Sequence, residues 1–308
     1  MLVGSLDRAK SKLQLRGIPD SSRSTDLSPM ADSGIDRLPE GCVAQAISLT
    51  SPRDACRSST VSSAFRSAAA SDTVWERFLP SDCHSILSRA VRPVEYSSKR
   101  DLFFLLCDSV LIDGGKMSFR LERSSGAKCY MLSASALTII WGDTPQYWKW
   151  VSLPDSRFPE VAKLVDVCWL EIRGRIHSKM LSPRTTYAAY LIFKLADRSR
   201  GLGHPAHETS VTVGAQSSTR AIRLQPRGTD RHARMMVNFP GGAPEVEEEE
   251  VGGLAREDGW LEAEMGEFYN EDGEDGEVEM SWMEVKGGHW KKGLILEGIE
   301  IRPKTLPV

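Results

Sequence analysis

The sequence predicts an α+β protein with two unlike parts, a small N-terminal bundle of helices followed by an antiparallel β-sandwich. Between Leu38 and Phe78, apolar residues recur at the three- and four-residue spacing of helices. Beyond Cys129, apolar and polar residues alternate with the two-residue period of half-buried strands. With 308 residues, 41% of them hydrophobic, the chain is long enough to give each part its own core.

The segment that precedes the bundle, residues 1–37, is rich in Ser, Asp and Arg and poor in aromatic residues. Such a composition buries too little apolar surface to offset the entropy of ordering the chain, so we expect disorder there. Because the short leader MADSGID begins at Met30 and leads directly into the bundle, we hypothesise that translation naturally starts at Met30.

The bundle itself is predicted over residues 38–84, with about three helices. Val43 and Ile47 lie four residues apart and therefore share one face of the first helix. Ser51 can cap a second helix, and the proline that follows it suits the first helical position. A last short helix carries Trp75.

The sandwich is predicted from alternating residues over residues 129–305. The clearest run is Leu170–Ile176, in which apolar positions alternate with charged ones, and Val278–Trp282 shows the same alternation. Near the end of the chain the phase slips around Gly298, which predicts a β-bulge there. Several such strands separated by turns favour an antiparallel sandwich.

Two stretches follow neither period. Residues 85–128 are mixed in character and are expected to bridge the two parts, with a helix over Ser98–Cys107. Residues 197–255 are rich in Gly, Pro and Glu and are expected to form an irregular insertion around two weak strands, Ser210–Val213 and Ala221–Leu224.

Charge and hydropathy exclude several classes of protein. Residues 245–279 hold 16 of the 42 acidic residues, whereas Lys and Arg are scattered singly along the rest of the chain, which argues against nucleic-acid binding. The apolar stretch Leu102–Leu106 is too short to span a membrane, and the N-terminus lacks the apolar core of a secretory signal. We therefore expect a protein of the cytosol or nucleus that contacts neither nucleic acid nor membrane.

Motifs typical of enzymes and metal sites are missing from the sequence. The GGK of Gly114–Lys116 resembles the end of a P-loop, but Val110 stands where the first glycine belongs. The six cysteines have no CxxC spacing and are expected to be reduced core thiols. His204 and His207 have HxxH spacing without a third ligand and are expected in a flexible surface loop. We therefore predict no catalytic residue, no bound metal and no cofactor.

An unusual aromatic run extends from Trp141 to Trp150. Sugar rings present flat C–H faces that pack on indole, and nearby polar side chains can hydrogen-bond to sugar hydroxyls. The predicted carbohydrate-binding residues are Trp141, Asp143, Tyr147, Trp148 and Trp150. For Trp148, packing in the core is an equally good interpretation. Trp169, within VDVCWLEI, is expected in the core.

Two sets of residues carry a likeness to a known family. The first is LPEGCVAQAISLTSPRDACRSSTVSSAFRSAAASDTVWERFLP, residues 38–80. The second consists of KCYMLSASALTIIWGDTPQYWKW, VCWLEIRGRI, YAAYLIFKL, EDGWLEAEMGEF and GEDGEVEMSWMEVKGGHWKKGLILEGIEIRP, between residues 128 and 303. Together they resemble the plant F-box proteins that carry a phloem protein 2 domain, which is related to the tobacco jasmonate-inducible lectin.

The resemblance implies a function for each part. The bundle would be an F-box that binds a Skp-type adaptor and, through it, a cullin-RING ubiquitin ligase. Its adaptor-binding positions would be Leu38, Pro39, Ile47, Leu49 and Trp75. The second part would be a jelly-roll-like lectin domain in which Trp141 and Trp148 support the binding of N-acetylglucosamine oligomers or N-glycans. The chain would then be a non-catalytic subunit that captures glycoproteins for ubiquitination.

Three residues depart from the pattern of the family. Ser58 and Thr60 stand where relatives tend to have leucine, so the helices are expected to pack less well, at a cost of about 1.5–3 kcal/mol for each buried leucine that is lost. Arg120 stands where many relatives place tryptophan, which removes one aromatic surface.

Two other functions are open on the sequence alone. Ser58 and Thr60 suggest a carbohydrate-binding lectin whose F-box has decayed, and capture of a Skp-type adaptor would count against it. The acidic residues 245–279 suggest an adaptor that recognises protein rather than glycan. The absence of a binding signal on a glycan array, together with capture of a target protein, would favour this second alternative.

Overall fold

The structure, a computed structural model, describes residues 38–224 and 253–304. The expected disorder of residues 1–37, the hypothesised start at Met30 and the acidic run Glu247–Glu250 lie outside the described residues.

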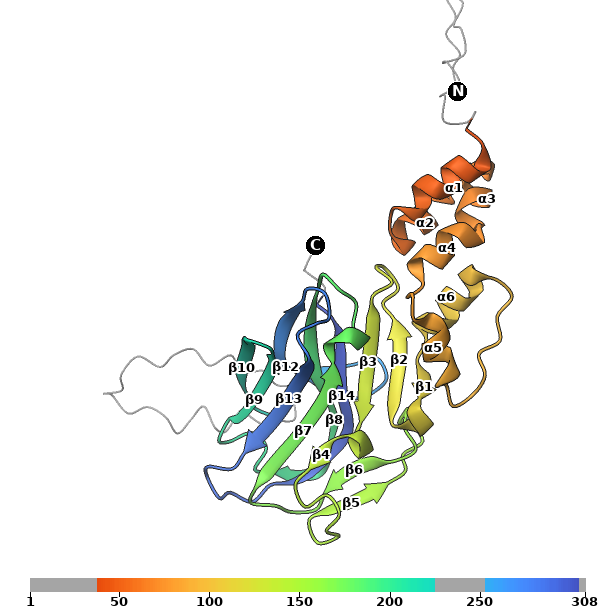
Figure 1. Cartoon of the computed structure of the whole chain (residues 1–308). Helices are drawn as coiled ribbons and strands as arrows, with labels where there is room; N and C mark the ends of the chain where they lie inside the picture. The colour runs from red at the N-terminus through yellow and green to blue at the C-terminus, as the bar shows by residue number, and fades with distance from the viewer. Residues whose placement is uncertain (1–37, 225–252, 305–308) are drawn as a thin grey trace, which may run out of the picture. The chain divides into compact units, whose positions relative to one another are not determined.

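The described chain begins with helices, several of which are capped by serine side chains. The helices are α1 (Glu40–Ser48), α2 (Pro52–Ser58), α3 (Ser63–Ala70), α4 (Asp72–Phe78), α5 (Cys83–Ser88) and α6 (Lys99–Cys107) (Figure 1). At α2, Ser51 accepts a hydrogen bond from the backbone N–H of Asp54, which confirms the predicted cap. At α6, Ser98 accepts one from the backbone N–H of Asp101, and the helix expected over Ser98–Cys107 is confirmed.

The predicted bundle of about three helices contains four up to Phe78. One expected helix is divided, because α2 ends at Ser58 and Ser62 caps a separate α3. Trp75 lies at the centre of the bundle, where its indole N–H donates to the carbonyl of Ala69 at 2.7 Å. Its ring lies 5.1 Å from that of Phe103, so α6 completes the core of the bundle.

Thr60 corrects one expectation about packing. Its side chain is exposed, and its hydroxyl donates to the carbonyl of Arg57 at 2.8 Å. A leucine here would add apolar surface on the outside of the bundle rather than fill the core, so the expected loss of buried area does not apply to Thr60. Ser58 is half-buried.

The described strands form two antiparallel sheets. The nine-stranded sheet has the order β1-β2-β3-β14-β8-β12-β11, with β6 beside β14 and β5 beside β6, and the five-stranded sheet has the order β10-β9-β13-β7-β4. The strands are β1 (Val110–Ile112), β2 (Met117–Leu121), β3 (Lys128–Ser133), β4 (Thr138–Ile139), β5 (Trp148–Val151), β6 (Val161–Leu164), β7 (Leu170–His177), β8 (Thr185–Arg200), β9 (His207–Val213), β10 (Gln216–Ile222), β11 (Leu254–Ala255), β12 (Leu261–Asn270), β13 (Glu277–Glu284) and β14 (Lys292–Pro303) (Figure 1).

The two sheets face each other across an apolar core, as an antiparallel sandwich requires. Gly174 in β7 lies against Leu132 of β3 and Ile299 of β14, which brings the sheets into contact. The bulge predicted at Gly298 is confirmed, because the register of β14 on β8 shifts between Leu296 and Gly298. A side chain at Gly298 would meet the Leu132 carbonyl, so only glycine fits there.

Two predicted boundaries differ from the structure. The expected bridge, residues 85–128, contributes β1 and β2 to the nine-stranded sheet, so the sandwich begins at Val110. The expected insertion, residues 197–255, contains β9 and β10, and β9 pairs with β13 inside the five-stranded sheet. These strands have seven residues each and are rich in Ser and Thr, so the alternation of apolar and polar residues is weak in their sequence.

A buried ionic network lies on the nine-stranded sheet. The Glu300 carboxylate pairs with Arg120 at 3.1 Å, with Arg256 at 2.8 Å and with Arg302 at 3.0 Å. Burial alone would raise the pKa of Glu300, but the three guanidinium charges outweigh burial and lower it to about 2. Arg120 thus forms an ion pair with the buried Glu300 at the position where many relatives are expected to have a tryptophan.

Candidate functional site

The predicted aromatic run forms the loop between β4 and β5 and the first strand after it. Backbone hydrogen bonds hold the loop as successive turns, with the N–H of Gly142 donating to the carbonyl of Ile139 at 2.9 Å. The N–H of Thr144 donates to the carbonyl of Trp141 at 2.9 Å, and that of Trp148 to the carbonyl of Thr144 at 3.0 Å. The loop therefore has a defined shape of its own, which lowers the entropic cost of binding a ligand.

Trp141 has an unusual backbone. Its φ of 57° lies in the left-handed region, which bulky residues rarely adopt and which costs about 1–3 kcal/mol. Its ring packs against Tyr147, with the ring centroids 5.1 Å apart and the planes tilted by 36°. Backbone strain of this kind concentrates at binding sites, so it supports a functional role for Trp141.

Trp148 and Trp150 both lie on β5 but differ in burial. Trp150 is partly exposed, and its indole N–H donates to the carbonyl of Gly142 at 2.9 Å, which ties the strand to the loop. Trp148 is 2% exposed and belongs to the hydrophobic core. The prediction that Trp148 contacts carbohydrate is therefore wrong for this structure, because neither face of its ring is free to stack on a sugar.

Asp143 is exposed at the tip of the loop. Its carboxylate accepts one long hydrogen bond, from the Thr144 hydroxyl at 3.4 Å. A carboxylate has about four acceptor positions, so Asp143 retains capacity to bind hydroxyl groups of a ligand.

Trp169 was expected in the core, and the structure corrects this. It is 44% exposed, and its indole N–H donates to the carboxylate of Glu171 at 2.9 Å. The sequence contained the signal, because Trp169 has the same parity as Glu171 and Arg173, which lie on the outer face of β7. Trp290, which lies outside the predicted aromatic run, is 52% exposed and is followed by two lysines.

All eight tryptophans lie in the described residues, and the four exposed ones lie on neighbouring segments. The N–H of Ile140 donates to the carbonyl of Glu171 at 3.0 Å, which joins the Trp141 loop to the start of β7. Val167 and Lys291 exchange backbone hydrogen bonds of 3.0 and 2.8 Å, which joins the Trp169 segment to the Trp290 segment. We define the aromatic end of the sandwich as Trp141, Tyr147, Trp150, Trp169 and Trp290.

The predicted adaptor-binding residues divide into two groups. Leu38, Pro39 and Leu49 are exposed, with Leu49 at 64%. Ile47 and Trp75 are buried in the bundle, so the prediction that they contact an adaptor directly is wrong and their role is to shape the bundle. Val61, 67% exposed between α2 and α3, is a further apolar surface residue.

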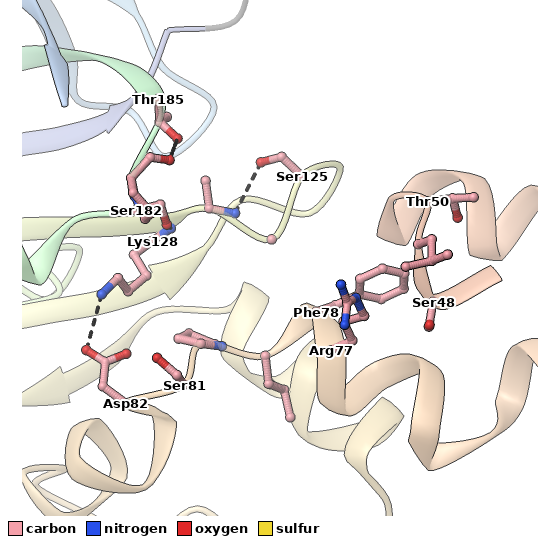
Figure 2. Close-up of a pocket in the computed structure, with 16 residues that line it drawn as sticks. Ser48, Thr50, Arg77, Phe78, Ser81, Asp82, Ser125, Lys128, Ser182 and Thr185 are labelled. Carbon is pink, nitrogen blue, oxygen red and sulfur yellow. Dashed lines mark hydrogen bonds and ion pairs between the residues drawn. The ribbon is translucent and has the colours of Figure 1, made fainter. Parts of the chain in front are cut away.

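A polar groove of about 470 Å³ lies where the helices meet the sandwich. Figure 2 shows the Lys128 side chain reaching toward Asp82, and the two form an ion pair at 3.1 Å. The other residues labelled there are largely hydroxyl-bearing, among them Ser125 and Thr185. The groove therefore marks a polar junction within the one compact unit to which the described residues from Pro39 onward belong.

Among residues 38–224 and 253–304, no three His, Cys, Asp or Glu side chains gather in a way that could hold a metal ion. His207, expected on a flexible loop, is buried on β9 and stacks on Trp282 with the ring centroids 5.5 Å apart. Burial lowers the pKa of His207 to about 4. The cysteines are free thiols, but Cys42 and Cys56 are exposed rather than in the core. Within the same residues, no helix is long and apolar enough to cross a membrane.

The fold and the site together define an antiparallel β-sandwich protein with an N-terminal helical module and an exposed aromatic end. The family model described as Phloem protein 2 matches residues 127–303. F-box protein PP2-B10 of Arabidopsis thaliana is 47% identical over 89% of this chain and 96% of its own. F-box protein PP2-B1 of Arabidopsis thaliana is 42% identical over 92% of this chain and 94% of its own.

The chain therefore belongs to the plant F-box proteins of the phloem protein 2 family. Among solved structures, a family 35 carbohydrate-binding module from Clostridium thermocellum covers 56% of this chain and 96% of its own, with 8% identity and a TM-score of 0.31. A likeness at this level carries no argument about function.

Proposed function

We propose that the chain is the substrate-recognition adaptor of an SCF-type cullin-RING ubiquitin ligase, and that its sandwich binds carbohydrate on target glycoproteins. The observation that carries the proposal is the combination of a helical module with a sandwich whose exposed tryptophans gather at one end, in a chain related to proteins named F-box proteins. Ubiquitin transfer would be carried out by other subunits, in the cytosol or nucleus.

The carbohydrate would bind on the loop between β4 and β5. Trp141 and Tyr147 offer adjoining aromatic rings, and Trp150 ties the loop to β5. The Asp143 carboxylate would accept hydrogen bonds from sugar hydroxyls, while the rings pack on the C–H faces. N-acetylglucosamine oligomers or N-glycans are the ligands that we expect. Trp148 would act from the core, by supporting β5.

The adaptor would bind at exposed apolar residues of the helices. The Ser67 hydroxyl donates to Glu40 at 2.8 Å, which links α3 to α1. Leu49 directly follows α1 and Val61 precedes α3, so both exposed residues lie in turns that border these linked helices. Exposed apolar patches on a protein surface mark sites that bind other proteins.

Capture of a recombinant Skp-type adaptor by the full chain tests the first half of the proposal. We expect stoichiometric capture by the wild type and loss of capture by the double variant Leu49→Glu, Val61→Glu. Val91→Glu is the matched control, because Val91 is an exposed apolar residue outside α1–α4. No capture by folded wild type would favour the alternative of a lectin with a decayed F-box.

One observation favours protein rather than glycan as the target. The turn between β12 and β13 exposes a series of carboxylates, which would suit a basic protein surface. The exposed residues are Glu271, Asp272, Glu274, Asp275 and Glu277. A glycan array without signal, together with salt-sensitive capture of a target, would support this alternative.

A further inference from the structure

The outer face of β7 carries a row of side chains that begins at Trp169. Side chains alternate along a strand, so residues 169, 171, 173 and 175 share one face. Trp169 donates to Glu171, and Glu171 accepts a second hydrogen bond, from Arg173, at 2.9 Å. Arg173 and Arg175 both pair with Glu279 of β13, at 3.2 and 3.3 Å. The row is therefore one ring followed by charged groups held in fixed positions by their neighbours.

This row adjoins the loop in which the carbohydrate is proposed to bind. Thr138 and Ile139 of β4 pair with Arg173 and Ile172 of β7, and Ile140 continues the pairing with Glu171. The chain then turns away from β7, because the N–H of Gly142 donates to the carbonyl of Ile139 at 2.9 Å. Trp141 directly follows the residue that bonds to Glu171, and Trp169 lies two residues before Glu171, so this hydrogen bond joins the segments that carry the two exposed rings.

Backbone contacts on the other side hold the Trp169 segment in place. The buried ammonium of Lys291 donates to the carbonyl of Cys168 at 2.8 Å and to that of His289 at 2.7 Å, and it pairs with Glu284. Lys291 thus fastens the segment before β7 to the segment before β14. The backbone next to Trp169 is therefore held in place, although the indole ring faces solvent.

We propose that Trp169, Glu171 and Arg173 form a second carbohydrate subsite, which takes sugar units of an oligosaccharide beyond those bound at Trp141. The proposal rests on the proposed carbohydrate-binding function and extends it. The chemistry favours an oligosaccharide over a protein surface, because a single ring beside ionised, hydrogen-bonding side chains suits a sugar ring with several hydroxyls. The row along β7 has no apolar side chain after Trp169, and Met283 of β13, which lies opposite Glu171 on this face, is half-buried, so the exposed apolar surface that forms the core of a protein interface is small here.

Within the subsite, Glu171 is a positioning residue for Trp169. Its carboxylate accepts the indole N–H and is itself oriented by Arg173. Glutamine at position 171 can still accept the indole N–H, whereas alanine cannot. If Glu171 only stabilised the fold, its substitution would weaken the binding of short and long oligosaccharides equally.

Calorimetric titration of the full chain with chitobiose, chitotriose and chitopentaose tests the proposal. We expect Trp169→Ala to weaken chitopentaose binding about tenfold, which corresponds to about 1.4 kcal/mol, and to leave chitobiose binding unchanged. Glu171→Ala should reproduce this length-dependent loss, and Glu171→Gln should retain most of the affinity. Tyr96→Ala, which removes an exposed ring elsewhere, is the control.

The possible failures are distinguishable. If the wild type binds these sugars and Trp169→Ala weakens all three equally or none of them, the second subsite is wrong while the carbohydrate-binding function stands. If the folded wild type binds none of the three, the proposed carbohydrate-binding function and the subsite fall together.

Discussion

Trp148 and Trp150 lie two residues apart on β5 and have the same chemistry, but one belongs to the core and the other to the surface. Their side chains leave the strand on the same side. Trp148 pairs with Leu164 of β6 and is enclosed, whereas Trp150 pairs with Ala162 and reaches the turn at Gly142. The position along the strand, rather than the residue type, decides whether a tryptophan is available to a ligand.

The same division applies to the other tryptophans. Trp75, Trp260 and Trp282 are buried with Trp148, and Trp141, Trp169 and Trp290 are exposed with Trp150. The exposed set gathers on three connected segments, while the buried set is spread through the bundle and the sandwich. Stability should therefore depend on the buried set and ligand binding on the exposed set.

The largest effect is expected at Trp148. Trp148→Ala should lower the free energy of unfolding by about 3–5 kcal/mol, because it leaves a cavity in the core. Trp150→Ala should cost about 1 kcal/mol, mainly for the lost hydrogen bond to Gly142. Urea denaturation of the full chain measures both. Equal decreases in the free energy of unfolding at the two positions would contradict the assignment of Trp148 to the core and Trp150 to the surface.

A variant of intermediate size tests how much of the stability lost at Trp148 comes from the missing ring. Its indole N–H has no hydrogen-bond partner among the described residues. Trp148→Phe removes this buried donor along with part of the ring, so it should cost clearly less than Trp148→Ala in the same urea experiment.

Charged residues show the same contrast between interior and surface. The pKa of Glu300 is lowered to about 2, so its carboxylate stabilises the fold at pH values above its unfolded pKa of about 4.3. This contribution, about 3 kcal/mol, should be lost as the pH falls from about 4.3 to about 2. Glu300→Gln should remove this part of the acid dependence of the urea midpoint. Glu277→Gln is the exposed control, and an equal effect of the two variants would contradict the assignment.

A smaller effect is expected at the junction between helices and sandwich. Lys128 is buried and pairs with the partly exposed Asp82, whereas the pair of Lys179 and Glu274 is exposed on both sides. Lys128→Met should lower the free energy of unfolding by about 1–2 kcal/mol, and Lys179→Met by less than about 0.5 kcal/mol. Thermal unfolding monitored by circular dichroism would rank the two variants, and the reverse order would contradict the larger contribution expected from the pair of Lys128 and Asp82.

The sequence predicted features that depend on local spacing. The cap at Ser51, the helix that begins after Ser98 and the bulge at Gly298 each follow from a few neighbouring residues, and each is confirmed. Alternation also predicted the strands around Leu170 and Val278. These features need no knowledge of which strands become neighbours.

The remaining features depend on tertiary pairing. The hairpin of β9 and β10 has weak alternation, and it is stabilised by its place beside β13. Whether Trp148 is buried depends on its pairing with β6, which the residue types do not reveal. The exposed tryptophans could be placed together only once the pairing of β4 with β7 and of Val167 with Lys291 was known.

The most direct test of the central claim is calorimetric titration of the full chain with chitotriose, comparing wild type, Trp141→Ala and the control Tyr96→Ala. We expect saturable binding by the wild type and by Tyr96→Ala, and at least about tenfold weaker binding by Trp141→Ala, equivalent to about 1.4 kcal/mol. Trp141→Ala should change the free energy of unfolding by less than about 1 kcal/mol, because the side chain is partly exposed. Absence of binding by folded wild type, or unchanged binding by Trp141→Ala, would contradict the claim that the aromatic end binds carbohydrate.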